Sequence, residues 1–129
     1  MKTILVIAFS LISFTTIAQT SCTDFKTGKF QIIEKGRPTT LIERNESFQI
    51  EHVGKIEVKL KITWIDDCTY KLSFVNGNEA FWETRPKDTP GEEVIVSIIK
   101  TNEKGYLQES RVEGYEYVYR SEILRVVDL

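Results

Sequence analysis

One stretch of strict alternation constrains the fold of this chain more than any other feature. Between residues 55 and 64 every second residue is apolar, and the residues between them are charged or polar. The apolar set is Ile56, Val58, Leu60, Ile62 and Trp64. Neighbouring side chains of a β-strand point to opposite faces, whereas at a helical period these five would be scattered around the cylinder. The segment is therefore predicted to be a long strand with one dry face and one wet face.

Shorter segments with the same character lie on both sides of this strand, and turns containing Gly, Asn, Asp or Pro separate them. The predicted strands are 28–34, 39–44, 48–52, 68–74, 93–101, 106–112 and 115–127. The connections are too short for the crossovers that parallel strands need. We therefore predict an all-β domain, a single antiparallel up-and-down barrel of about eight strands, with a two-sheet sandwich as the alternative. Segment 93–101 is apolar on both faces, so we expect it to be covered on both sides.

One connection, residues 76–91, is longer than the others and contains two adjacent aromatic residues, Phe81 and Trp82. Connections of this length are typical of lids, binding loops or disordered segments. Residues 79–83 are predicted to form one short helical turn, the only helix expected after the N-terminal segment. Two interpretations stay open: the aromatic pair closes the end of the barrel as simple packing, or it gates the mouth of a ligand site.

The N-terminal segment indicates export. Lys2 is followed by an apolar stretch from residue 4 to residue 14, and then by small residues at Thr16 and Ala18. This pattern is typical of a signal peptide, and the apolar stretch is shorter than the roughly 20 residues that span a bilayer. We expect residues 1–18 to be removed and residues 19–129 to form one domain that is periplasmic or secreted, with no integral membrane segment. A buried helix of a cytosolic protein, or lipid anchoring at Cys22, is a less favoured alternative.

Charge excludes one class of partner. Lys2 is the only charged residue in segment 1–18, so residues 19–129 carry 16 basic and 19 acidic residues. The two signs are interspersed, without a basic run or an acidic tail. A slightly acidic domain of this kind has no electrostatic footprint for nucleic acid.

Two cysteines, Cys22 and Cys68, remain after the predicted cleavage. In an oxidising compartment a small, even number of cysteines indicates a disulfide, and two allow only one intramolecular pairing. The rival interpretation, a zinc site, lacks ligands because the chain has a single histidine. We predict a Cys22–Cys68 bridge that ties the N-terminal segment to the middle of the chain.

Patterns that carry catalysis or hold a cofactor are absent from the sequence. There is no Gly-x-Ser-x-Gly nucleophile turn, no phosphate-binding glycine loop and no cluster of metal-ligating residues. The adjacent Asp66 and Asp67 are interpreted as turn formers. His52 is a candidate ligand-binding residue if Phe48 and Ile50 point inward, because His52 would then point inward as well; the alternative places it half-exposed at the barrel rim. We predict no catalytic residues, no metal site and no cofactor.

Two blocks of the sequence resemble a group of small exported bacterial proteins of unknown function. The blocks are Cys-x-Asp-Phe-x-x-Gly-x-Phe at 22–30 and Trp-Ile-x-x-Cys-x-Tyr-x-Leu at 64–72. Some members of that group are labelled DNA topoisomerase IV. A domain of this size and charge, without glycine-rich nucleotide motifs, has neither the ATPase module nor the DNA-binding patch of such an enzyme.

The chain is also similar to the lipocalin-like superfamily. Gly28 and Phe30 occupy the positions of the Gly-x-Trp motif of the first lipocalin strand, with Phe in place of Trp. The resemblance implies that a late arginine, either Arg120 or Arg125, packs over that aromatic ring. It also implies a barrel whose interior holds a small molecule.

The favoured function is therefore a non-catalytic binder of a small apolar or amphipathic molecule. The alternative is a protein–protein interaction module with a filled core, such as an inhibitor or an envelope assembly factor, and an enzyme with no visible signature is the third possibility. A barrel of about eight strands can be filled by its own side chains or can hold one small ligand, so the sequence leaves this choice open. The predicted ligand-binding residues are Trp64, Tyr70, Leu72, Phe74, Phe81, Trp82 and His52.

Overall fold

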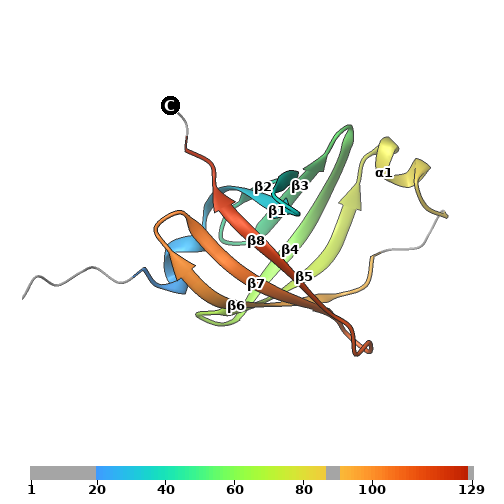
Figure 1. Cartoon of the computed structure of the whole chain (residues 1–129). Coiled ribbons are helices and arrows are strands. Elements are labelled where there is room, and N and C mark those ends of the chain that lie inside the picture. Colours follow the sequence, from blue (N-terminus) through green and yellow to red (C-terminus); the bar gives the residue numbers. More distant parts are fainter. Residues whose placement is uncertain (1–19, 87–90, 128–129) are drawn as a thin grey trace, which may run out of the picture.

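The protein forms a closed barrel of eight antiparallel strands, with a short helical piece at each end (Figure 1). The computed structural model describes residues 20–86 and 91–127, so the predicted signal peptide lies outside the described residues. The elements are η1 (Cys22–Phe25), β1 (Gly28–Glu34), β2 (Arg37–Arg44), β3 (Phe48–Val53), β4 (Ile56–Asp66), β5 (Thr69–Gly77), α1 (Glu79–Glu83), β6 (Val94–Asn102), β7 (Gly105–Val112) and β8 (Val118–Arg125).

The strand order is that of a simple meander. Each strand pairs antiparallel with the next along the chain, and β8 pairs with β1 to close the barrel. This topology confirms the prediction of an up-and-down barrel and removes the sandwich alternative. It is compatible with a lipocalin-like fold.

The alternation of β4 is preserved in three dimensions. Ile62 is buried, Val58 and Leu60 line the interior, and the intervening Glu57 and Lys61 are exposed. Because one face of the strand is dry and the other wet, a slip of one residue would expose the whole apolar set, and this fixes the register. The prediction for this strand is therefore confirmed.

Two strand predictions need correction. The outer face of β6 is not covered, since Ile99 is 51% exposed although Val96 and Ile98 are buried. A barrel has a single dry interior, so apolar residues on both faces of a strand do not require a second covering layer. The last strand begins at Val118 rather than at residue 115, because the turn after β7 extends through the tyrosine-rich segment 115–117.

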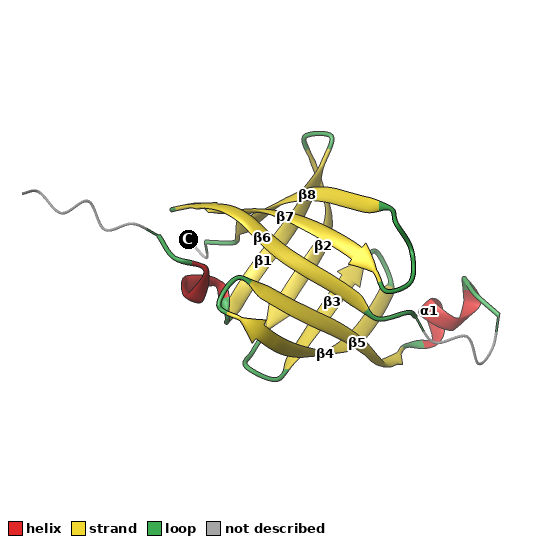
Figure 2. Cartoon of the chain, turned by 90° about the horizontal axis from the view of Figure 1, so that it is seen from below, coloured by secondary structure: helices red, strands yellow, loops and turns green. Residues whose placement is uncertain are grey.

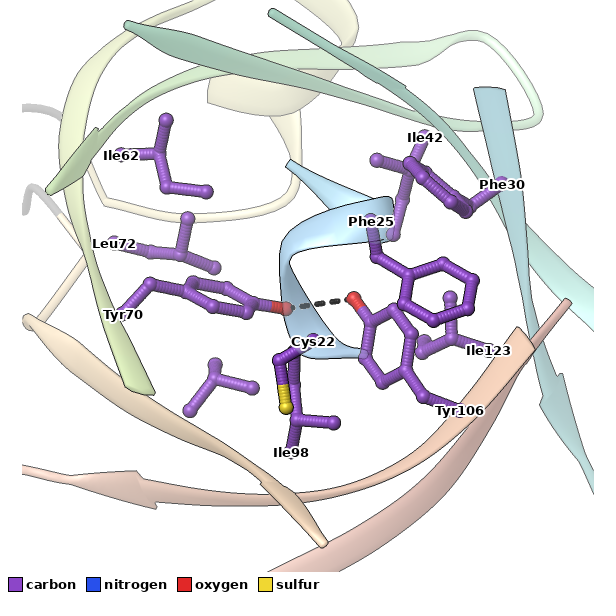
Figure 3. Close-up of a cluster of buried hydrophobic side chains, with 11 residues drawn as sticks. Cys22, Phe25, Phe30, Ile42, Ile62, Tyr70, Leu72, Ile98, Tyr106 and Ile123 are labelled. Carbon is purple, nitrogen blue, oxygen red and sulfur yellow. Dashed lines mark hydrogen bonds between the residues drawn. The ribbon is translucent and has the colours of Figure 1, made fainter. Parts of the chain in front are cut away.

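The two ends of the barrel differ, and η1 and α1 lie at opposite ends (Figure 2). At the η1 end, Phe25 inserts into the barrel and is 1% exposed, and its ring packs 5.2 Å from that of Tyr106. The buried apolar cluster fills this half of the interior (Figure 3). We call the η1 end the closed end and the α1 end the open end.

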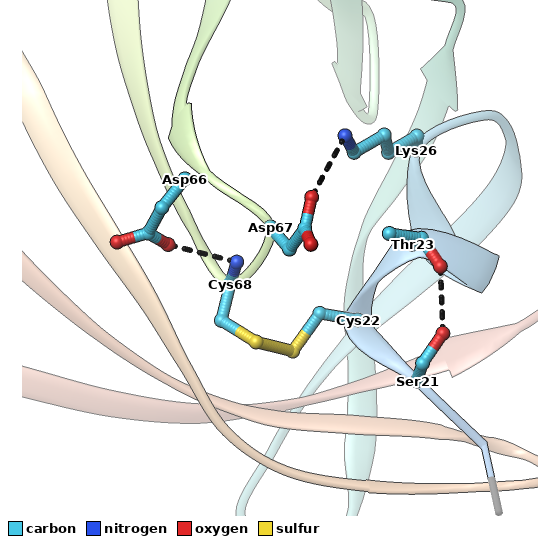
Figure 4. Close-up of polar contacts among 7 residues, drawn as sticks. All are labelled: Ser21, Cys22, Thr23, Lys26, Asp66, Asp67 and Cys68. Atoms are coloured by element: carbon cyan, nitrogen blue, oxygen red, sulfur yellow. Dashed lines mark hydrogen bonds and ion pairs between the residues drawn. A yellow bond between two sulfur atoms is a disulfide. The ribbon is translucent and has the colours of Figure 1, made fainter.

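The predicted disulfide is present and fastens η1 to the barrel (Figure 4). Cys22 bonds to Cys68, which lies in the turn between β4 and β5. Lys26 Nζ lies 3.5 Å from a carboxylate oxygen of Asp67, and Asp66 Oδ1 accepts a hydrogen bond from the backbone N–H of Cys68. The adjacent aspartates thus form the turn, as predicted. A disulfide is typical of exported proteins, and no described helix is long and apolar enough to cross a membrane.

Candidate ligand cavity

The open half of the barrel contains a cavity of about 600 Å³. Apolar side chains from six elements make up most of its wall: Ile32, Val58, Leu60, Leu72, Phe74, Phe81, Val94, Val96 and Val112. Ligand sites are typically concave, mostly apolar and about 300–1,000 Å³ in volume, with a few polar groups that fix orientation. The interior of this barrel is therefore filled at the closed end and hollow at the open end.

Besides Glu34, Ser110 and Tyr119, the polar side chains of the wall lie at two levels. Glu51, Gln108 and Ser121 project from the middle of β3, β7 and β8, next to the filled half of the barrel. Nearer the mouth, Arg85 follows α1 and Glu92 precedes β6. We call Glu51, Gln108 and Ser121 the polar floor of the cavity.

A buried arginine below this floor organises the closed end. Arg44 is 5% exposed, and its Nη2 donates hydrogen bonds to the hydroxyl oxygens of Tyr70 (3.1 Å) and Tyr106 (2.9 Å). Its Nη1 donates to the carbonyl oxygen of Phe25, 2.8 Å away, so the guanidinium also anchors the η1 plug. The charge centre lies 4.8 Å from the ring centroid of Phe30, in a cation–π arrangement. Every one of these partners comes from a different part of the chain, so Arg44 ties the closed end together.

Hydrogen bonds connect Arg44 to Glu51 in the floor. Arg44 Nε donates to Oε1 of Gln49 at 2.9 Å, and Nε2 of Gln49 donates to Oε1 of Glu51 at 2.9 Å. Gln49 is 1% exposed and bridges the cation to the carboxylate. A buried amide with both ends engaged holds the Glu51 side chain in one orientation.

A second chain of hydrogen bonds reaches the other side of the floor. The hydroxyl groups of Tyr70 and Tyr106 lie 2.9 Å apart, and Tyr70 donates to Oε1 of Gln108 at 3.2 Å (Figure 3 shows the tyrosine pair). Nε2 of Gln108 then donates to Oγ of Ser121 at 2.9 Å. The polar floor is therefore one continuous network centred on Arg44.

The charge states of this network follow from burial and from its partners. Burial acts to lower the pKa of Arg44, but the phenol oxygens of Tyr70 and Tyr106 more than offset it, so this pKa is raised and the guanidinium stays charged. Burial raises the pKa of Tyr70 well above its ordinary value despite the opposing effect of Arg44, which keeps the phenol neutral. Burial also raises the pKa of Glu51, and the hydrogen bond from Gln49 and the charge of Arg44 only partly counteract this.

The raised pKa of Glu51 has a consequence for stability. A carboxyl group whose pKa is raised on folding stabilises the fold below its ordinary pKa of about 4.5, and this contribution is lost as pH rises through the folded pKa. We therefore expect Glu51→Gln to be more stable than the wild type at neutral pH, with a Tm higher by a few degrees, because the variant has no buried carboxyl group to ionise. The advantage should shrink in acid. Thermal melts of both proteins across this range check the prediction, and a wild type that is as stable as the variant at neutral pH would contradict it.

Helix α1 closes part of the open end, and the predicted helical turn at residues 79–83 is confirmed. The Asn78 side chain caps the helix by accepting a hydrogen bond from the N–H of Phe81. Phe81 is 4% exposed and stacks on Phe74 at 5.4 Å, with Trp82 set edge-on against both rings. A Cβ atom at Gly77 would lie 2.2 Å from the Phe81 ring, so only glycine permits this packing.

The structure separates the seven predicted ligand residues into three groups. Leu72, Phe74 and Phe81 line the cavity, and Trp82 packs beside them at its mouth. Trp64 and Tyr70 instead lie together in the filled half, with their rings 4.7 Å apart. Trp64 Nε1 is buried there, and it alone among the described buried side-chain N and O atoms has no hydrogen-bond partner.

His52, the seventh residue, lies on the outer face of the barrel. Its Nε2 is 3.5 Å from a carboxylate oxygen of Glu43 on the neighbouring strand β2. In β3 the polar Gln49 and Glu51 point inward, whereas Phe48 and Ile50 point outward. An inward His52 required Phe48 and Ile50 to point inward, so His52 does not line the cavity. The apolar residues of this short strand are outside because Gln49 and Glu51 find buried partners in Arg44 and in each other.

Five polar residues of the network were not identified from the sequence: Arg44, Gln49, Glu51, Gln108 and Ser121. Each lies in a predicted strand, and each occupies an inward position where the apolar alternation would place a hydrophobic residue. For Gln49 and Glu51 the alternation with Phe48 and Ile50 indicates the wrong inward face, so the observed arrangement conflicts with the local pattern. Such conflicts between local pattern and global fold are expected at functional sites.

Fold and cavity together define a closed β-barrel with one plugged end and an internal cavity. Comparison with protein-family models, with curated proteins and with solved structures finds no match to this chain. One detail agrees with the lipocalin-like resemblance. Of the two candidate arginines it is Arg125 whose guanidinium lies over the Phe30 ring, 5.8 Å from its centroid, and also over Phe25 at 5.0 Å.

Proposed function

We propose that this protein is a non-catalytic binder of a small apolar or amphipathic molecule, which it holds in the cavity of the open half. The observation that carries the proposal is the cavity itself, about 600 Å³ in volume and walled mainly by aliphatic and aromatic side chains. An eight-stranded barrel can be filled by its own side chains or can hold one small ligand, and apolar surface left without packing partners costs stability. A void of this volume is accounted for if a ligand supplies the missing contacts.

The construction of the floor supports binding rather than catalysis. Its hydrogen-bond donors and acceptors are largely satisfied within the protein, and Arg44 is sealed beneath aromatic rings. Such a rigid, preorganised surface reduces the entropy lost when a ligand is ordered against it. Among residues 20–86 and 91–127, no group of three or more His, Cys, Asp or Glu residues is placed to hold a metal ion.

A variant that narrows the cavity tests this function. Leu60→Trp places a larger side chain in the cavity wall, and we expect it to reduce the affinity for the uncharged fluorescent probe N-phenyl-1-naphthylamine at least about tenfold. The matched control is Lys61→Trp, because Lys61 is the next residue of β4 and points to solvent. Fluorescence titration of the two variants and the wild type gives the affinities. Equal affinities in all three proteins would show that the probe binds elsewhere and would count against the proposal.

One observation favours the alternative of a protein–protein module. Apolar side chains are exposed around the turn between β7 and β8, namely Tyr115, Tyr117, Val118 and Tyr119, which are 41–73% exposed. Aromatic residues of this kind are enriched in interfaces. Recovery of a single partner protein, lost on Tyr117→Ser and with no small molecule retained by the barrel, would support this alternative over the ligand binder.

A further inference from the structure

We propose that the ligand carries a protonated amine, or a comparable cationic donor, at the end that enters the barrel first, and that Glu51 receives it. This inference rests on the proposed function and adds the chemical class of the ligand. It follows from three features of the described residues. Arg44, below the floor, is inaccessible to a ligand; Glu51, in the floor, is accessible; and carboxylates outnumber cations around the cavity.

Arg44 is not available to an anionic ligand. All three of its nitrogens already donate hydrogen bonds, to Gln49, to the carbonyl of Phe25 and to the two tyrosine hydroxyls. It is 5% exposed and does not line the cavity. A carboxylate or phosphate entering the cavity would therefore meet the floor without reaching the positive charge beneath it.

Glu51, in contrast, is accessible to a hydrogen-bond donor that enters the cavity. Its carboxylate lines the cavity, and one oxygen, Oε1, accepts the hydrogen bond from Gln49. Among the described residues no other group donates to this carboxylate, so Oε2 is left for a donor that enters the cavity. Gln49 is itself held by Arg44, so the carboxylate is oriented before a ligand arrives. An ammonium group would supply the missing donor and, in direct contact, a positive charge that Arg44 provides only from behind Gln49.

The charge balance of the wall points the same way. Three carboxylates, Glu34, Glu51 and Glu92, line the cavity, whereas Arg85 is the one cation among the described lining residues. The Arg85 guanidinium lies over the Phe81 ring, 4.2 Å from its centroid, at the mouth rather than at the floor. An entering cation is therefore attracted toward the interior, and an entering anion is repelled from it.

Three probes of equal chain length separate this inference from the proposed function. We would measure displacement of the fluorescent probe by decylamine, decanol and decanoate, each below its micelle concentration, for the wild type, Glu51→Gln and Glu57→Gln. Glu57 lies on the outer face of β4 and serves as the control carboxylate. The wild type and the control should bind decylamine at least about tenfold more tightly than decanol, and decanoate most weakly. Glu51→Gln should lose the preference for the amine and keep its affinity for decanol.

The outcomes are distinguishable. If decanol or decanoate displaces the probe as well as decylamine does, the cavity binds amphipathic molecules but the amine inference is wrong. The same conclusion follows if Glu51→Gln retains the preference for the amine. If none of the three displaces the probe, the proposed function and the inference both fail. Because Gln is close to Glu in size and carries no charge to bury, the variant is expected to fold and to give an interpretable result.

Discussion

Replacing Arg44 by methionine is expected to destabilise the protein by at least about 3 kcal/mol. The change keeps an apolar stem of similar length but removes every hydrogen bond of the guanidinium at once. The Phe25 carbonyl and the Gln49 amide oxygen would lose their donor, and leaving a buried polar group unsatisfied costs about 1–3 kcal/mol for each group. The cation–π contact with Phe30 would also be lost. Urea denaturation monitored by circular dichroism gives the change in the free energy of unfolding.

Arg111→Met is the matched control, because Arg111 is exposed on the outer face of β7. We expect it to change the free energy of unfolding by no more than about 0.5 kcal/mol. Arg44→Lys should also be strongly destabilising, since a single ammonium cannot reproduce the planar arrangement of donors that reaches four acceptors. An Arg44→Met protein as stable as the control would show that the network does not hold the closed end together.

Removing the disulfide is expected to destabilise the protein by a comparable amount. Cys22 and Cys68 are separated by 46 positions, and closing a loop of that length restricts the unfolded chain by about 4 kcal/mol in the chain-entropy treatment. The double variant Cys22→Ser/Cys68→Ser should therefore melt roughly 15 °C below the wild type. We also expect η1 to loosen, which would expose Phe25 at the closed end of the barrel. Differential scanning calorimetry measures the loss of stability.

Reductant provides an internal control for this prediction. It should lower the melting temperature of the wild type to nearly that of the double variant, and it should leave the double variant unchanged. If reductant lowered the melting temperature of both proteins equally, the effect would not arise from the bridge between η1 and the turn before β5.

Much of the fold was predictable because its determinants are local. The alternation of Val58, Leu60 and Ile62 with exposed Glu57 and Lys61 fixes a strand and its inward face, and short turns then leave antiparallel pairing as the only economical arrangement. The bridge between the two cysteines and the helical turn before Thr84 followed from equally local evidence.

The site was only partly predictable because its polar residues are defined by partners that are distant in sequence. Arg44 has partners on η1, β3, β5 and β7, and the sequence contains no sign that these elements meet around it. The side chains of Gln49 and Glu51 point inward because of that hydrogen-bond network, although both residues are polar. Trp64 and Tyr70 were predicted to line a cavity, but sequence periodicity gives only the face of a strand. It does not give the level along the barrel at which packing ends and the cavity begins.

Native mass spectrometry of the protein purified from its natural source shows whether the barrel holds a small molecule. We predict an additional mass, that of one small organic molecule per chain, which dissociates on gentle activation and is absent from the Leu60→Trp protein prepared in the same way. The contradicting result is a wild-type protein that carries no small molecule, gives the same spectrum as Leu60→Trp and is recovered instead in a complex with one partner protein.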